Sequence, residues 1–128
     1  MGEMTQSLED YLEAIYRLSS HTGAACVRDV AKALNVKMPS VVKAIRELKR
    51  LELAVQEPYA AIELTAKGRR VARSVLSRHT LLRDFLVRIG VRSEVADVDA
   101  CRMEHILSAE TIDRIRIFTE SKHEKPNQ

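Results

Sequence analysis

The chain has few of the residues that build sandwiches, barrels or aromatic cores. Among its 128 residues there are 4 glycines, 3 prolines and no tryptophan, and aromatic residues make up 4%. Scarce Gly and Pro favour helices over an all-β fold, and the core has to come mainly from Leu, Ile, Val and Ala. The length predicts one compact domain or two small subdomains, for which a shared dimer interface would add buried surface.

Membrane and export signals are also missing. No run of about 18 apolar residues occurs, so we expect neither a transmembrane helix nor a membrane partner. The first ten residues, MGEMTQSLED, are acidic and polar, which is unlike a signal peptide. The 2 cysteines, Cys26 and Cys101, lie far apart. A disulfide between them stays open, but we expect a cytoplasmic protein with two thiols.

The charge is unevenly spread. From Cys26 to Arg73 there are 11 Lys and Arg against 5 Asp and Glu, a local net charge of +6 within a chain of net charge +3. A basic middle predicts an anionic partner, and the acidic remainder suits a cation. Ordinary charged helix surfaces are the alternative explanation.

Apolar periodicity predicts a mainly helical chain. Helices are expected at 8–19, 27–34, 38–51, 66–89, 94–107 and 109–119, with β-strands at 53–56 and 61–64 around a tip at 57–60. Proposed N-caps are Ser7 (with Asp10 completing a capping box), Thr65, Ser93 and Ser108.

Helix, turn, helix and hairpin follow one another from residue 27 to residue 64, which is the order of a winged helix-turn-helix. The second helix of that unit enters the DNA major groove with its N-terminal end. Residues there and nearby supply hydroxyl, ammonium and guanidinium groups for bases and phosphates. The alternative is a solvated surface on an ordinary helical bundle. Candidate DNA-binding residues are Arg28, Lys37, Pro39, Ser40, Lys43, Arg46, Lys49, Arg50 and, at the wing tip, Tyr59.

A second pattern is the stretch CRMEHIL at 101–107. On a helix, Cys101, Glu104 and His105 fall within about 100° of arc, so they share a face. Thiolate, carboxylate and imidazole are all ligands for first-row metals. Three ligands from one helix leave a metal site incomplete, so partners are needed elsewhere.

Further candidate ligands are Asp10 and Glu13 in the first helix and His79 in the long helix. Each has a structural alternative: Asp10 as a capping residue, Glu13 as a surface carboxylate, and His79 as a polar residue with its own hydrogen-bond partners at a helix edge. A catalytic Cys–His pair is a further interpretation of Cys101 and His105, but the sequence shows no oxyanion loop or substrate cleft, so we do not expect an enzyme.

Four segments together resemble the diphtheria toxin repressor and manganese transport regulator family of metal-activated transcriptional repressors. They are SLEDYLEAIYRL (7–18), VRDVAKALNVKMPSVVKAIRELKRLELAVQEPYAAIELTAKG (27–68), SRHTLLRDFL (77–86) and CRMEHILSAETIDRI (101–115). The resemblance implies a winged helix-turn-helix domain at 1–72 and a helical metal-binding and dimerisation domain at 73–128. It also implies a divalent metal between the two domains.

Carried over position by position, His79, Glu104 and His105 match ligands of both branches of the family. Asp10 and Glu13 match ligands of the manganese branch, whereas Cys101 matches a cysteine of the iron branch. This hybrid set pairs hard oxygens, which favour Mn²⁺, with a thiolate, which favours softer ions. Because the thiolate is the discriminating group, we expect Fe²⁺ ahead of Mn²⁺.

Two features depart from the iron branch. Arg83 stands where that branch places a glutamate of its ancillary metal site, so we expect that site to be absent. The chain ends at Gln128, so we expect no C-terminal SH3-like domain.

The combined expectation is a cytoplasmic, homodimeric, metal-dependent repressor of metal-ion homeostasis that binds a palindromic double-stranded operator. The alternatives are a metal-independent winged-helix regulator that senses a small organic ligand, and a metal-binding enzyme or buffer.

Overall fold

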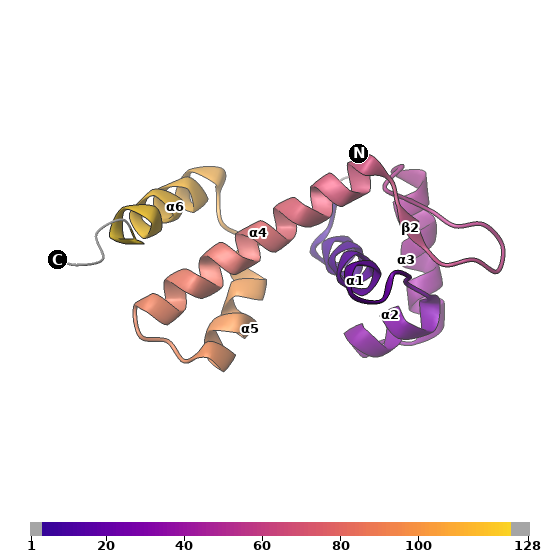
Figure 1. Cartoon of the computed structure of the whole chain (residues 1–128), viewed down its shortest axis with the longest axis horizontal. Coiled ribbons are helices and arrows are strands. Elements are labelled where there is room, and N and C mark those ends of the chain that lie inside the picture. Colours follow the sequence, from indigo (N-terminus) through magenta and orange to yellow (C-terminus); the bar gives the residue numbers. More distant parts are fainter. Residues whose placement is uncertain (1–3, 124–128) are drawn as a thin grey trace. The chain divides into compact units, whose positions relative to one another are not determined.

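The computed structural model describes residues 4–123 and divides the chain into two compact units, Met1–Ser74 and Val75–Gln128 (Figure 1). The described part is mainly helical, as predicted. The elements are α1 (Gln6–Thr22), α2 (Val27–Leu34), α3 (Met38–Arg50), β1 (Ala54–Val55), β2 (Glu63–Leu64), α4 (Ala66–Arg88), α5 (Ser93–Met103) and α6 (Ala109–His123).

Helix α1 starts and ends outside its predicted limits. Its N-cap is Thr5, whose hydroxyl accepts a hydrogen bond from the Leu8 amide at 3.1 Å. The prediction of Ser7 as the cap was therefore wrong, because the helix begins at Gln6 and Ser7 already lies within its first turn. Gly23 ends the helix with φ 82°, a left-handed conformation that glycine adopts without strain.

The helix-turn-helix lies at α2 and α3. Asn35 adopts φ 55° in the turn, and its amide donates to the backbone carbonyl of Lys32 at 3.3 Å. Pro39 sits in the first turn of α3, where its missing N–H is not needed. Val30, Val41 and Leu48 are fully buried, so both helices turn an apolar face toward α1, which they contact.

The wing is a short antiparallel hairpin in which Ala54 pairs with Leu64 and Val55 with Glu63. Both strands are shorter than predicted. A separate bridge joins Ile62 to Ala25, where the Ile62 amide donates to the Ala25 carbonyl at 2.7 Å.

Thr65 caps α4 as predicted, accepting from the Gly68 amide at 2.9 Å. A Cβ on Gly68 would stand 2.0 Å from the Leu53 carbonyl oxygen, so only glycine allows this close approach.

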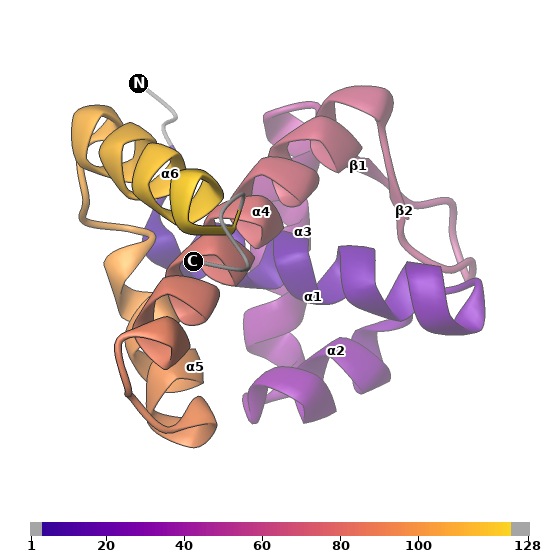
Figure 2. The ribbon, with the colours of Figure 1, turned by 60° about the vertical axis from the view of Figure 1, so that its left-hand side comes forward.

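In the second unit, α5 and α6 flank the C-terminal half of α4 (Figure 2). Leu82, Ala100 and Ile112, one from each helix, form its buried core. Ser108 caps α6 as predicted, accepting from the Thr111 amide at 3.2 Å. No helix in the described part of the chain has the length and apolar character needed to cross a bilayer.

Helix α5 ends at Met103, four residues earlier than predicted. Glu104 is its C-cap, and the His105 amide donates to the Arg102 carbonyl at 3.3 Å, a tighter turn than the α-helical pattern. The assumption that Glu104 and His105 continue a regular helix was therefore wrong. The N-cap is Arg92 rather than Ser93, and it caps without a side-chain hydrogen bond.

Candidate functional site

Four predicted metal ligands come together within the second unit. His79 lies on α4, Cys101 on α5, and Glu104 and His105 on the turn that follows α5. The Nδ1 atom of His79 is 3.2 Å from Oε1 of Glu104, and Nε2 of His105 is 3.6 Å from Oε2 of the same carboxylate. Glu104 thus stands between two imidazoles.

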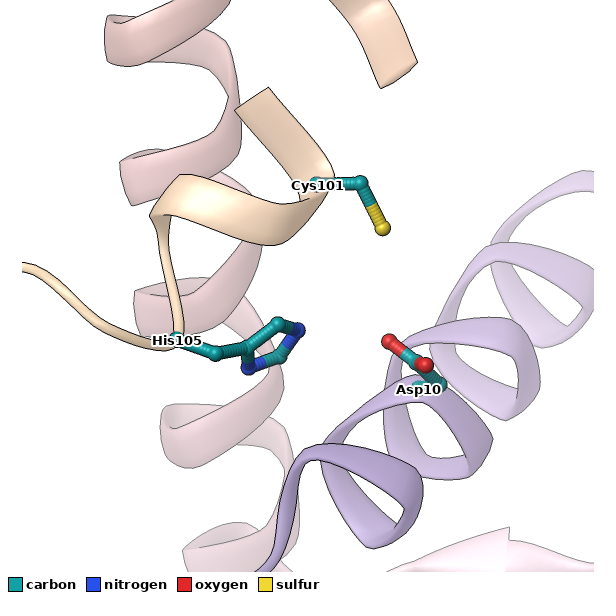
Figure 3. Close-up of side chains that lie close together, drawn as sticks. All are labelled: Asp10, Cys101 and His105. Atoms are coloured by element: carbon teal, nitrogen blue, oxygen red, sulfur yellow. The ribbon is translucent and has the colours of Figure 1, made fainter. Parts of the chain in front are cut away.

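The thiol of Cys101 belongs to the same cluster. Figure 3 shows its sulfur and the His105 ring on the same side of the segment, and the two donor atoms lie within 4.8 Å of each other. Both cysteines of the chain are thiols. The turn is tied to α4, because Nε of Arg78 donates to the Glu104 carbonyl at 3.3 Å.

Asp97 on α5 is a contact that the sequence did not reveal. Its Oδ1 lies 2.8 Å from Nε2 of His79. The two residues are 18 positions apart and meet only because α5 packs against α4. A carboxylate in α5 and a histidine in α4 share no sequence pattern that would have paired them.

The other two candidate ligands lie on α1 in the first unit. With Thr5 as the N-cap, Asp10, also drawn in Figure 3, does not occupy the N3 position of a capping box. Glu13 is engaged: its Oε2 accepts from Arg17, from Nε at 2.9 Å and from Nη2 at 2.6 Å. A cation that binds Glu13 therefore has to share this carboxylate with a guanidinium.

The donors of the second unit fit a first-row divalent ion. Imidazole, thiolate and carboxylate all bind such ions, and the set mixes hard and soft donors. Two donor atoms that are each about 2.1 Å from one ion, at right angles, lie roughly 3 Å apart, close to the 3.2 Å between His79 and Glu104. The Glu104 side chain is 0% exposed, and a buried carboxylate is costly unless a cation or hydrogen bonds compensate it.

All the predicted DNA-binding residues lie in the first unit, and all of them are exposed. On α3 the buried positions fall on one side, and Pro39, Lys43, Arg46 and Arg50 share the opposite one. Such a face, rich in cationic groups, is suited to phosphates and base edges.

Arg50 is partly engaged within its own helix. It forms an ion pair with Glu47 on the same surface. The hydrogen bond from Arg50 lowers the pKa of Glu47, and the same bond raises the pKa of Arg50. A phosphate that binds Arg50 therefore has to compete with the Glu47 carboxylate for the guanidinium.

Exposed residues beyond the predicted set share this unit. Met38 and Val42, one turn apart on α3, are large exposed apolar side chains, and Lys67, Arg70 and Arg73 form an exposed basic row along α4. The i, i+3 spacing of that row was visible in the sequence. At the wing tip Tyr59 is exposed with φ 62°.

Comparison with known proteins gives matches along most of the chain. The family model described as "Iron dependent repressor, N-terminal DNA binding domain" matches residues 3–62. The one described as "Iron dependent repressor, metal binding and dimerisation domain" matches residues 65–128.

Two curated relatives illustrate the similarity. An uncharacterised HTH-type transcriptional regulator of Methanocaldococcus jannaschii is 38% identical, over 95% of this chain and 99% of the relative. The HTH-type transcriptional regulator MntR of Geobacillus kaustophilus is 44% identical, over 87% of this chain and 79% of the relative.

Solved structures of metal-dependent regulators have a similar fold. IdeR of T. acidophilum matches with a TM-score of 0.76 and 34% identity, over 88% of this chain and 53% of that one. The manganese regulator SloR matches with a TM-score of 0.80 and 28% identity, over 91% of this chain and 55% of that one. The chain therefore spans about half the length of these two solved chains.

The fold and the donor cluster define a DNA-binding regulator with a metal-binding domain, and the chain belongs to the iron-dependent repressor family. Members of this family are metal-dependent transcriptional repressors that bind operator DNA and dimerise, and they are not enzymes. The predicted winged helix-turn-helix and dimerisation domains are confirmed.

Proposed function

We propose that this chain represses transcription when a divalent metal joins donors from both of its domains, taken as residues 1–72 and 73–128. The observation that carries the proposal is the second-unit cluster, in which the buried Glu104 carboxylate lies between His79 and His105 beside the Cys101 thiol. Asp10 and Glu13 on α1 supply two further oxygen donors, as the family resemblance implies. The metal ligands proposed are Asp10, Glu13, His79, Cys101, Glu104 and His105.

Fe²⁺ is the proposed metal, with Mn²⁺ close behind. The thiolate of Cys101 favours the softer ion, while the three carboxylates are compatible with either. The family model is that of iron-dependent repressors, whereas the similar protein SloR is a manganese regulator. Replacing Cys101→Glu should raise the affinity for Mn²⁺ relative to Fe²⁺ or Co²⁺. An unchanged ranking of metals would show that the thiol does not set the preference.

DNA recognition is assigned to the N-terminal half of α3. Lys37, Pro39 and Ser40 would reach base edges in the major groove, with Lys43 beside them. The exposed Met38 and Val42 suit the methyl groups of thymine. Phosphate contacts are assigned to Arg28, Arg46, Lys49 and Arg50, and a wing contact to Tyr59.

A homodimer with a palindromic operator is the proposed assembly, located in the cytoplasm. An apolar groove on the second unit supports it: Phe85 on α4 and Phe118 on α6 meet edge to face, with ring centroids 6.1 Å apart, beside Ile115. Leu82 and Ile112 are buried in the core of their own unit, so they are left out of the proposed interface. Two-fold symmetry of the protein then requires two-fold symmetry of the operator.

Metal would activate binding by restricting the separation of the two recognition helices of the dimer, which must reach half-sites about 34 Å apart or a multiple of that. A coupling of about 1–3 kcal/mol corresponds to a 5–150-fold change in operator affinity. The metal supplies the link, and the residues of the chain supply its ligands and the DNA contacts.

The test is an operator-binding titration with Fe²⁺ under anaerobic conditions, with Mn²⁺, and with a chelator. We expect tight binding with either metal and at least fivefold weaker binding with the chelator. Equal affinity in all three conditions would support a metal-independent regulator. Absence of sequence-specific binding in every condition would contradict the repressor function itself.

A further inference from the structure

Besides its neighbour Glu104, His79 contacts a second carboxylate, that of Asp97. The Nε2 atom of His79 lies 2.8 Å from Oδ1 of Asp97, while its Nδ1 atom lies 3.2 Å from Oε1 of Glu104. All three residues belong to the second unit, on α4, α5 and the turn after α5. The imidazole is therefore held from both sides.

The two carboxylates differ in their surroundings. The side chain of Glu104 is 0% exposed and that of Asp97 is 62% exposed, while the His79 side chain between them is 11% exposed. An exposed carboxylate keeps its hydration and is the less suited of the two to holding an ion in a closed site. A buried carboxylate beside an imidazole nitrogen is the better candidate for direct coordination.

We propose that Asp97 is a positioning residue that fixes the tautomer and orientation of His79 so that its Nδ1 lone pair faces the metal. A neutral imidazole has one N–H, and an acceptor on one nitrogen decides which nitrogen carries the proton. With the proton on Nε2 and donated to Asp97, Nδ1 is left as an acceptor beside Glu104. Histidine ligands in metalloproteins commonly rely on such an outer carboxylate.

The same contact limits what else His79 can do. Its Nε2 is committed to Asp97, so His79 has one nitrogen to offer and serves one ion. The guanidinium of Arg83, which pairs with Asp84 at 3.3 Å, follows one turn further along α4. Both features disfavour a second cation on the outer side of His79.

The inference rests on the proposed ligand role of His79, so the experiment separates the two. Without metal, ¹⁵N NMR of the His79 ring at pH 8 should show protonation at Nε2 in the wild-type chain. Asp97→Ala should lose that preference, and Asp97→Asn, which keeps an acceptor oxygen, should retain part of it. A His79 ring with the same tautomer in Asp97→Ala as in the wild type would overturn the proposal.

Binding of Co²⁺, followed by its visible absorption, gives the second measurement. Asp97→Ala should weaken Co²⁺ binding by about 10- to 100-fold, and Asp97→Asn by less. Asp99→Ala removes an exposed carboxylate from the same helix and should leave the affinity unchanged. Wild-type affinity in Asp97→Ala would contradict the positioning role.

A third variant isolates the ligand assignment. If His79→Ala binds Co²⁺ as tightly as the wild type, His79 is not a ligand and the proposed metal site is wrong at that position. The NMR measurement of the His79 tautomer in the Asp97 variants does not depend on metal binding, so it would still test the positioning role of Asp97. If Asp97→Ala does not fold, both the NMR measurement and the Co²⁺ titration are made on Asp97→Asn.

Discussion

The two units of the chain differ in what they bury. The first unit has a continuous apolar core that includes Leu12, Ile15 and Leu48, all fully buried. The core of the second is smaller, and the polar residues that are buried in the described part of the chain, His79 and Glu104, both belong to it. Burial of a carboxylate beside imidazoles costs stability unless something compensates it. The first unit is thus held by apolar packing, whereas the second combines a smaller apolar core with buried polar side chains.

The largest effect should come from the core of the first unit. Leu48→Ala removes a fully buried side chain, and we expect a loss of about 2–5 kcal/mol in the free energy of unfolding. Urea denaturation measures it, with Leu48→Met, which nearly conserves volume, as the control. We expect the stability of this core not to depend on the metal. If saturating Mn²⁺ abolished the loss in the free energy of unfolding, that expectation would be wrong.

Next in size is the effect of removing the central carboxylate of the second unit. Glu104→Ala should abolish the metal response of operator binding, a change of up to about 150-fold, while the chain remains folded. Thermal unfolding with and without metal gives the parallel measurement, because an ion that binds the folded state raises its stability. Glu94→Ala, at an exposed position of α5, should keep both responses. A metal response that survives in Glu104→Ala would remove Glu104 from the ligand set.

A smaller effect is expected on the DNA surface of the first unit. Lys43→Ala should weaken operator binding by roughly tenfold and lower the salt dependence of binding by about one counterion. Metal affinity in the absence of DNA should be unchanged, because Lys43 is not one of the proposed metal ligands. The comparison between the units would fail if this variant altered metal affinity instead.

The smallest effect concerns Glu13, which Arg17 already holds. Arg17→Met should release the carboxylate and tighten metal binding by up to about fivefold, because the Arg17 partner of the pair is about half exposed, at 49%, and such an ion pair contributes about 1 kcal/mol. Arg116→Met breaks a similar pair with Asp113, at 3.1 Å, and serves as the control. Weaker binding in Arg17→Met would mean that Arg17 orients Glu13 for the metal rather than competing with it.

Local patterns in the sequence predicted much of the fold. The limits of α2 were correct because Asn35 and the apolar spacing mark them, and Thr65 and Ser108 cap their helices as expected. The errors fell where two local solutions compete. Thr5 rather than Ser7 caps α1, and the chain leaves the helix at Glu104 although 104–107 could have continued it.

The donor types of the site were visible in the C-x-x-E-H spacing, but their arrangement was not. His105 lies on a tight turn, so its direction cannot be read from helical periodicity. The contact of His79 with Asp97 depends on the packing of α4 against α5, and no local signal encodes it. The ion pair of Glu13 with Arg17 follows from i, i+4 spacing and could have been predicted.

The central claim is that metal and operator binding are coupled through the two units. The most direct measurement is the affinity for Mn²⁺ or Co²⁺, determined with and without saturating operator DNA, alongside the operator affinity with and without metal. Linkage requires both affinities to change by the same factor, which we expect to lie between about 5 and 150. A metal affinity that is unchanged by the operator would contradict the account.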